Sequence, residues 1–143
     1  VENRWVMTKV ASNTKSVVLD GMQDSIIPLC ITLKHGQLYF RDHGKLKDNK
    51  IKLDDLLTLQ YTDQLEDQAD SYPENPTGSM FAMAGFCSSD GKVSALMGLP
   101  ERGFQSTQMP CEKGENVEYG PWLRLFVNAR KWVEDNPQPP IRF

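Results

Sequence analysis

The chain has 143 residues, of which 39% are hydrophobic, and this is enough for one globular domain with its own core. Sixteen Lys and Arg residues against nineteen Asp and Glu residues give a net charge of -3, and the basic residues are scattered rather than gathered in one stripe. This distribution disfavours nucleic acid as a partner. No apolar run approaches the roughly 20 residues that span a membrane, and the first residues lack the features of a signal peptide. We therefore expect a soluble, cytoplasmic protein.

The cysteines and histidines are few and widely separated. Cys30, Cys87 and Cys111 have no Cys-x-x-Cys spacing, and none lies in the glycine-flanked strand-to-helix turn that a nucleophilic cysteine uses. We interpret them as thiols of a reducing compartment, with those in apolar runs buried. His35 and His43 have no second ligand at helical or hairpin spacing, so we predict no metal site in this chain.

The first third of the sequence predicts two strands. The runs RWVMTKV (residues 4–10) and SIIPLCITL (residues 25–33) are rich in β-branched and apolar residues and are bounded by turn formers. The second is apolar on both faces, as in a covered sheet. Gly36 predicts a turn after it, and residues 38–40 predict a short strand that would form a hairpin with 25–33.

The middle of the sequence predicts an ordered loop followed by a hairpin. YPENPTGS (residues 72–79) contains two prolines and a glycine, which favours a fixed loop over a flexible linker. Two apolar runs then flank Ser89-Asp90-Gly91, and Asp-Gly between such runs is a strong hairpin signal.

A helix is predicted near the C-terminus, starting at Pro121, which suits a first helical position. Its apolar residues recur at helical spacing and form one face: Trp122, Leu125, Phe126, Ala129, Trp132 and Val133. The proline-rich tail, residues 136–143, cannot continue the helix and is predicted to be extended.

Two residues are candidates for a functional site. Glu101 follows a predicted strand, where α/β folds place catalytic groups, although a surface glutamate beside Arg102 has the same sequence signature. His35 lies at a predicted turn and is either a general base or a solvated turn histidine. Their residue types alone leave both readings open.

Five segments of the chain resemble the C-terminal glutamine amidotransferase domain of the phosphoribosylformylglycinamidine synthases, which are also called formylglycinamide ribonucleotide amidotransferases. They run in family order through residues 1 to about 133: RWVMTKV, GMQDSIIPLCITLKHG, YPENPTGS, AGFCSSDGKVSALMGLPER and YGPWLRLFVNARKWV. The resemblance implies an α/β fold, namely the C-terminal part of a class I glutamine amidotransferase (flavodoxin-like) sheet that contains parallel strands, with a β-hairpin and a C-terminal amphipathic helix. Residues 1–143 would be the second half of that domain.

The resemblance also implies an activity and a set of roles. In the family a Cys-His-Glu triad hydrolyses glutamine, and the ammonia passes to an ATP-dependent synthetase part in purine biosynthesis. Glu101 matches the acid of a His-Pro-Glu-Arg stretch, whereas Leu99 stands where the family has the histidine base. His35 matches a His-Gly near the active-site side. The nucleophile of the family lies upstream of the segment that matches residues 4–10.

These departures leave more than one expectation. The chain is either part of a working glutaminase within such a ligase, or a degenerate, catalytically inactive amidotransferase kept as a protein-interaction or structural subunit of a larger assembly. Leucine cannot move a proton, so we expect no activity from the chain alone. The expected partners are the remainder of the parent enzyme or a complementary chain, with glutamine as the family substrate. No cofactor is expected in this chain, because ATP and magnesium would belong to the synthetase part.

Overall fold

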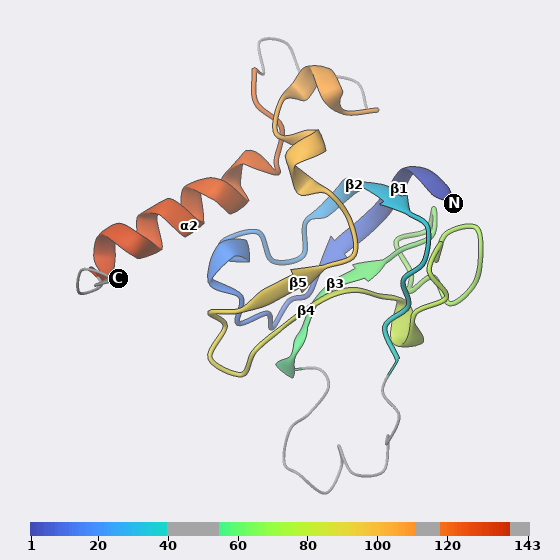
Figure 1. The fold of residues 1–143 in the computed structure, drawn as a ribbon, viewed down its shortest axis with the longest axis horizontal. Coiled ribbons are helices and arrows are strands. Elements are labelled where there is room, and N and C mark those ends of the chain that lie inside the picture. Colours follow the sequence, from blue (N-terminus) through green and yellow to red (C-terminus); the bar gives the residue numbers. More distant parts are fainter. Residues whose placement is uncertain (40–54, 111–117, 138–143) are drawn as a thin grey trace, which may run out of the picture.

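The computed structural model describes residues 1–39, 55–110 and 118–137. Five strands form one sheet in the order β2-β1-β3-β4-β5, and every pairing between neighbours in it is antiparallel. A helix follows the last strand (Figure 1). The strands and the helix are β1 (Glu2–Val10), β2 (Ile26–Leu33), β3 (Leu57–Tyr61), β4 (Met83–Cys87), β5 (Ser94–Leu96) and α2 (Leu123–Asp135).

The two strands predicted in the first third of the sequence pair with each other. β1 and β2 run antiparallel, from the pair Glu2 and Leu33 to the pair Lys9 and Ile26. Alternate side chains of β1 from Val6 to Val10 are buried, because the period of a strand is two residues, whereas in β2 Pro28 is buried as well as its neighbours Ile27 and Leu29. This inner face forms part of the core, with Val6, Thr8 and Val10 from β1 and Ile27, Leu29 and Ile31 from β2.

The hairpin predicted around Asp90-Gly91 is confirmed. β4 and β5 pair in the register Gly85 to Leu96 and Cys87 to Ser94. The Asp90 carboxylate accepts hydrogen bonds from Ser88 Oγ at 2.6 Å and from the Lys92 N–H at 3.2 Å, which shapes the turn. Glycine is required at position 91, because its φ is +72° and a Cβ there would lie 1.8 Å from the carbonyl oxygen of Lys15.

The short strand predicted at residues 38–40 is wrong for the residues that the structure describes, and Phe40 lies outside them. Leu38 is not in a strand. Its N–H donates to Ser79 Oγ at 2.9 Å, and its carbonyl oxygen accepts from the Met80 N–H at 3.1 Å. Ser79 and Met80 thus satisfy the backbone N–H and carbonyl groups of Leu38, which are then not available for a hairpin with β2. The sequence near Leu38 gives no sign of these distant partners.

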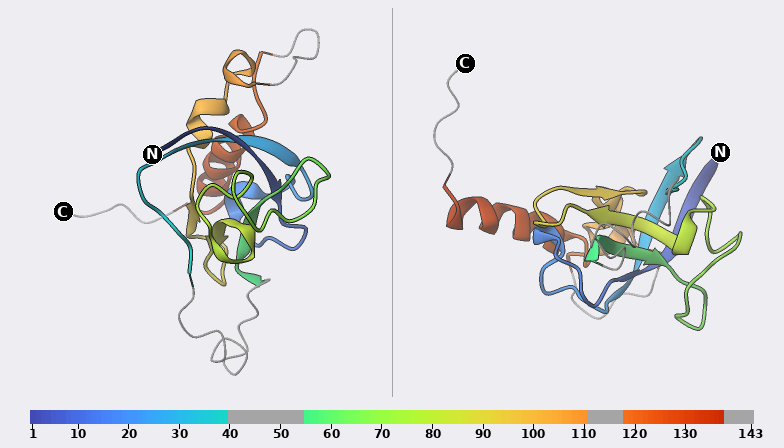
Figure 2. Two further views of the ribbon diagram at one scale, coloured as in Figure 1. Left: turned by 90° about the vertical axis from the view of Figure 1, so that its right-hand side faces the viewer. Right: turned by 90° about the horizontal axis from the view of Figure 1, so that it is seen from below.

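Helix α2 confirms the predicted amphipathic helix, but it begins at Leu123 rather than at Pro121, and of the predicted face only Trp122, which precedes α2, is fully buried. Asn128 Nδ2 donates to the carbonyl oxygens of Val18 and Asp20 at 3.1 and 2.8 Å, and so fixes the helix to the 3-10 helix η1 (Val17–Leu19). Phe126 and Val133, which belong to the predicted face, remain 42% and 53% exposed. Figure 2 shows the cause, because α2 extends past the edge of the sheet.

The fold is α/β with a hairpin and a C-terminal helix, as expected, but the predicted parallel strands are not found among the described pairings. Parallel neighbours need a crossover of a dozen or more residues, usually a helix. α2 comes after the last strand of this sheet and therefore cannot serve as such a crossover. Of the predicted tail, only residues 136 and 137 are described, and neither is helical.

Within the described ranges, no helix is both long enough and apolar enough to cross a membrane.

Candidate active site

Glu101 lies on a short turn just after the last strand of the sheet. This turn is the 3-10 helix η4 (Pro100–Gly103), which begins after Leu99. Pro100 suits the start of η4, since the N–H that proline lacks would have no partner inside the helix. The Glu101 side chain is exposed. The strand-to-turn placement predicted for Glu101 is therefore confirmed, while its catalytic role stays a prediction.

The backbone around Glu101 is fixed against β2. The N–H of Leu99 donates to the carbonyl oxygen of Cys30 at 2.8 Å, and the N–H of Arg102 donates to the carbonyl oxygen of Leu99 at 3.1 Å. A Cβ at Gly98 would lie 2.5 Å from Leu29 Cγ, so only glycine permits this approach. The turn can therefore present a carboxylate to solvent from a rigid support.

His35 lies beside the segment that leads to Glu101. It follows the end of β2 and is exposed. A Cβ on the next residue, Gly36, would lie 2.9 Å from Met97 Cε, so this turn packs against the chain four residues before Glu101. No hydrogen bond or ion pair of either side chain is found within residues 1–39, 55–110 and 118–137. The structure brings the two segments together without joining the two side chains.

The 72–79 loop is ordered, as predicted, and it contacts the segment that follows His35. Asn75 is 1% exposed, its Nδ2 donates to the Ser79 carbonyl oxygen at 2.9 Å, and its Oδ1 accepts from the Ser79 N–H at 3.2 Å. The loop also accepts hydrogen bonds from Gln37, through the Gly78 carbonyl oxygen at 2.5 Å, and from Arg4, through the Pro73 carbonyl oxygen. It is therefore tied both to the segment after His35 and to β1.

The described cysteines do not resemble nucleophiles. Cys87 is 2% exposed, and burial raises the pKa of its thiol, which disfavours the reactive thiolate. Cys30 lies within β2 and is half-buried. Cys111 lies outside the described residues. In the part of the chain that the structure describes, no group of three His, Cys, Asp or Glu side chains could hold a metal ion.

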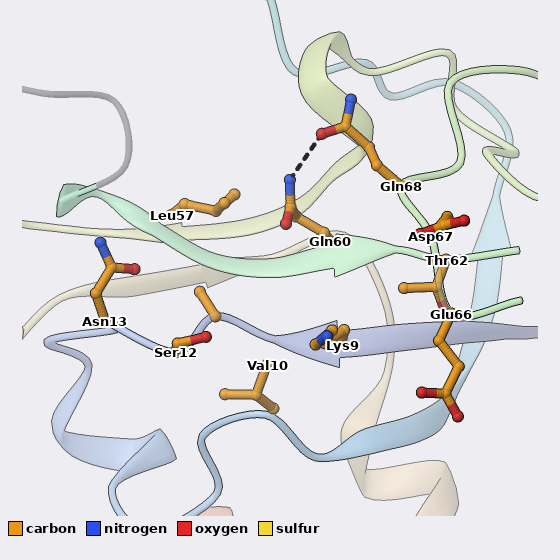
Figure 3. A pocket seen from close by; sticks show the side chains of 11 residues that line it. Lys9, Val10, Ser12, Asn13, Leu57, Gln60, Thr62, Glu66, Asp67 and Gln68 are labelled. Carbon is orange, nitrogen blue, oxygen red and sulfur yellow. Dashed lines mark hydrogen bonds between the residues drawn. The ribbon is translucent and has the colours of Figure 1, made fainter.

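A polar groove lies away from the predicted residues, between the end of β1 and β3 (Figure 3). It has a volume of about 360 Å³, and in it Gln60 Nε2 donates to Gln68 Oε1 at 3.2 Å. Lys9, Glu66 and Asp67 supply charges of both signs. Neither Glu101 nor His35 lines this groove, so it does not extend the predicted site.

Sequence reasoning missed the residues that hold the Glu101 turn from behind. Trp122 is fully buried, and its Nε1–H donates to the carbonyl oxygen of Pro28 at 2.7 Å. Gly103, at the end of η4, packs against the Trp122 ring. The available signal was the set of glycines close to Pro-Glu-Arg and Pro-Trp, because glycine often marks a close approach of two segments.

Comparison with known proteins gives one family and a consistent set of relatives. The family described as CobB/CobQ-like glutamine amidotransferase domain matches residues 1–133. Phosphoribosylformylglycinamidine synthase of Drosophila melanogaster is 35% identical over 142 residues and aligns with 96% of this chain. The proteins of the same name from Dictyostelium discoideum and Homo sapiens are 34% and 32% identical and align with 93% and 92% of it. The chain spans only about 10% of the length of each of these three.

These matches confirm the resemblance that the five segments indicated. Each relative aligns with nearly the whole chain, so the similarity is not confined to the Glu101 turn or to α2. The match to the family includes β1, the hairpin, η4 and most of α2. The chain therefore belongs to the family of CobB/CobQ-like glutamine amidotransferase domains.

Proposed function

We propose that this chain is the second half of the glutamine-hydrolysing domain of a phosphoribosylformylglycinamidine synthase. The observation that carries the proposal is the exposed carboxylate of Glu101 on a backbone-fixed turn, in a chain that aligns almost end to end with synthases of this name. A longer polypeptide would supply the nucleophile and the synthetase part. ATP and magnesium stay predictions for that synthetase part, as does a cytoplasmic location, and glutamine hydrolysis by the residues of this chain requires neither ATP nor magnesium.

The role that we assign to this half of the domain is to orient and stabilise the imidazole that transfers protons during glutamine hydrolysis. A thiolate attacks the side-chain amide carbon of glutamine, the C–N bond breaks, and the nitrogen leaves as ammonia after it takes a proton from an imidazolium. Water then hydrolyses the thioester to glutamate and restores the thiol. A carboxylate that accepts a hydrogen bond from the imidazole orients it and stabilises its charged form, and we assign this role to Glu101.

Because of Leu99, we expect glutamine hydrolysis by this protein to be slow. It stands two residues before Glu101, where the resemblance places the base, and its side chain can neither accept nor donate a proton. Loss of a triad member costs on the order of 10⁴ to 10⁶ in rate. We therefore expect the full-length protein to form its product readily from added ammonia and only slowly from glutamine. The degenerate, non-enzymatic alternative finds no support in the relatives, each of which is named as a synthase.

The test is to restore the base in the full-length protein. A Leu99→His variant should raise glutamine hydrolysis by at least about 100-fold, because general-base catalysis contributes roughly 10² to 10⁴. The matched control is Leu99→Gln, which is polar and of similar size but cannot act as a base at neutral pH. Ammonia-dependent product formation should stay unchanged in both variants, and so report an intact fold.

Two outcomes would contradict the proposal. If Leu99→His and Leu99→Gln hydrolyse glutamine equally slowly while ammonia still supports product formation, this turn is not part of a glutaminase. If the unchanged protein already hydrolyses glutamine at a rate that Leu99→His cannot improve, the base lies elsewhere and the roles assigned to this turn are wrong.

A further inference from the structure

The indole of Trp122 reaches behind the Glu101 turn to the edge of the sheet. The side chain is fully buried, and its Nε1–H donates to the carbonyl oxygen of Pro28 at 2.7 Å. β2 is an edge strand of the described sheet, and proline is tolerated at such an edge because it has no N–H to contribute to the ladder. The edge thus offers a carbonyl oxygen, and Trp122 satisfies it.

The same edge also holds the other end of the turn. Cys30 lies two residues after Pro28 in β2, and its carbonyl oxygen accepts from the N–H of Leu99 at 2.8 Å. Carbonyl groups two residues apart in a strand point to the same side. β2 therefore fixes the chain before Glu101 through Cys30, and the indole behind Glu101 through Pro28.

The indole contacts the turn directly at Gly103. A Cβ on Gly103 would lie 2.8 Å from Trp122 Cδ1 and 2.8 Å from Met109 Sδ, so a glycine is needed for the ring to lie this close. Gly103 is the last residue of η4, two positions after Glu101. A shift of the ring would therefore be transmitted to the turn over a very short path.

The segment just before α2, at Gly120, contacts the end of the η4 turn. The N–H of Gly120 donates to the carbonyl oxygen of Phe104 at 2.7 Å. A Cβ on Gly120 would lie 2.3 Å from the carbonyl oxygen of Gly103, closer than real Cβ contacts occur. The residues on either side of Glu101 are thus held by β2 on one side and by residues 120–122 on the other.

We infer that Trp122 is a positioning residue for glutamine hydrolysis, because its hydrogen bond to Pro28 fixes the η4 turn and with it the placement of the Glu101 carboxylate. The inference rests on the function proposed above. Trp122 would act only through the turn and would not touch glutamine. A misplacement of about 1 Å at a catalytic group can cost about 100-fold in rate, so the effect should appear in kcat.

The experiment uses the full-length protein with Leu99→His, which supplies measurable glutamine hydrolysis. Trp122→Phe keeps an aromatic ring and removes the N–H donor, and Trp132→Phe is the matched control. Trp132 lies within α2, which begins directly after Trp122, and Lys92 Nζ lies 6.0 Å from its ring centre. Trp132 is not among the groups found against Gly103. The readouts are kcat and KM for glutamine, and ammonia-dependent turnover as the measure of an intact fold.

Trp122→Phe should lower kcat for glutamine by roughly 10- to 100-fold with KM changed less than threefold and ammonia-dependent turnover unchanged, whereas Trp132→Phe should leave all three unchanged. An unchanged kcat in Trp122→Phe, or an equal loss in both variants, would overturn the inference. If even Leu99→His alone hydrolyses no glutamine, it is the proposed function that fails.

Gly120→Ala is the second variant, for the case that Trp122→Phe also loses ammonia-dependent turnover through misfolding. Its methyl group would push on the Gly103 carbonyl and leave the indole donor in place. In that case Gly120→Ala must lower kcat for glutamine hydrolysis by a larger factor than it lowers ammonia-dependent turnover. Equal losses of the two activities would overturn the inference.

Discussion

The N–H of Leu99 donates to the carbonyl oxygen of Cys30 across 2.8 Å, and this bond joins the turn that carries Glu101 to the edge strand β2. The two residues are far apart in sequence, yet the close approach of Gly98 to Leu29 places them together. The position where the family resemblance puts a histidine therefore has a fixed backbone. A side chain introduced at position 99 would extend from the same fixed backbone, so a substitution there changes the side chain without moving the turn.

Gly91 should be the less replaceable of two glycines with positive φ. A Cβ at Gly91 would lie 1.8 Å from the Lys15 carbonyl oxygen, whereas at Gly78, with φ of +62°, the nearest atom is Gln37 Nε2 at 3.4 Å. Gly78→Ala should cost only the conformational penalty of about 1–2 kcal/mol, and Gly91→Ala should cost more, because backbone must also move. Urea unfolding measures both free energies, and equal losses would contradict the assigned packing of the hairpin turn.

Burial of Tyr61 predicts a loss of stability at alkaline pH. Burial of the phenol raises its pKa from 10.0 to about 12, and the Thr77 hydroxyl opposes this shift. Between these values the folded chain keeps the proton and the unfolded chain releases it, so the free energy of unfolding falls as pH rises, by roughly 1.4 kcal/mol per unit. Below pH 10 the phenol is protonated in both states, so this loss of stability is absent there.

The test is the pH dependence of urea unfolding between pH 9 and 12. Tyr61→Phe should remove this part of the decline, while Tyr72→Phe, at a tyrosine that is 66% exposed, should retain it. An identical decline in the unchanged protein and in Tyr61→Phe would show that another group is responsible.

Asn75 should be the residue that keeps the 72–79 loop ordered. Its amide makes two hydrogen bonds with the backbone of Ser79 and is 1% exposed. Asn75→Ala removes the donor to the Ser79 carbonyl oxygen and leaves the Ser79 N–H only its longer bond to Thr77 Oγ1 at 3.3 Å, at a cost of about 1–3 kcal/mol. Limited proteolysis should then cleave within the loop faster than in the control Asn3→Ala, whose side chain accepts only an exposed bond from Thr32 at 3.0 Å. Equal cleavage rates would mean that other contacts order the loop.

Loss of the indole donor should also be visible in stability. Trp122→Phe leaves the Pro28 carbonyl oxygen without its bond and should cost about 1–3 kcal/mol, whereas Trp132→Phe, at a half-buried ring, should cost less. Guanidinium unfolding followed by circular dichroism makes the comparison independent of tryptophan fluorescence. A larger loss from Trp132→Phe would place the main anchor of this region at the far end of α2.

Local patterns predicted local structure well. Runs of β-branched and apolar residues bounded by turn formers predicted β1 and β2, Asp90-Gly91 predicted the hairpin, and helical spacing predicted α2, because each signal depends on neighbours in sequence. The pattern around Leu38 failed, since the partner of its N–H is Ser79, some forty residues away. The exposure of Phe126 was equally unpredictable, because the periodicity of a helix gives its apolar face and not what covers that face.

The candidate site shows the same division. The placement of Glu101 at a strand end could be predicted from sequence, whereas its support could not. Trp122 looked like one member of an apolar helix face, and only the fold reveals its bond to Pro28. Gly98, Gly103 and Gly120 hinted at close approaches but could not identify the segments that approach. Chain contacts over tens of residues decide these features.

The most direct test of the role of Glu101 is the rate of glutamine hydrolysis by the full-length protein with Leu99→His, with and without Glu101→Gln. Removal of a carboxylate that orients the imidazole should lower this rate by roughly 10³- to 10⁴-fold, with ammonia-dependent turnover unchanged. Glu134→Gln in the same background is the control, because Glu134 pairs with Arg130 on the exposed face of α2, and it should leave the rate unchanged. If Glu101→Gln hydrolyses glutamine as fast as its Leu99→His parent, the η4 turn does not carry the acid of a glutaminase.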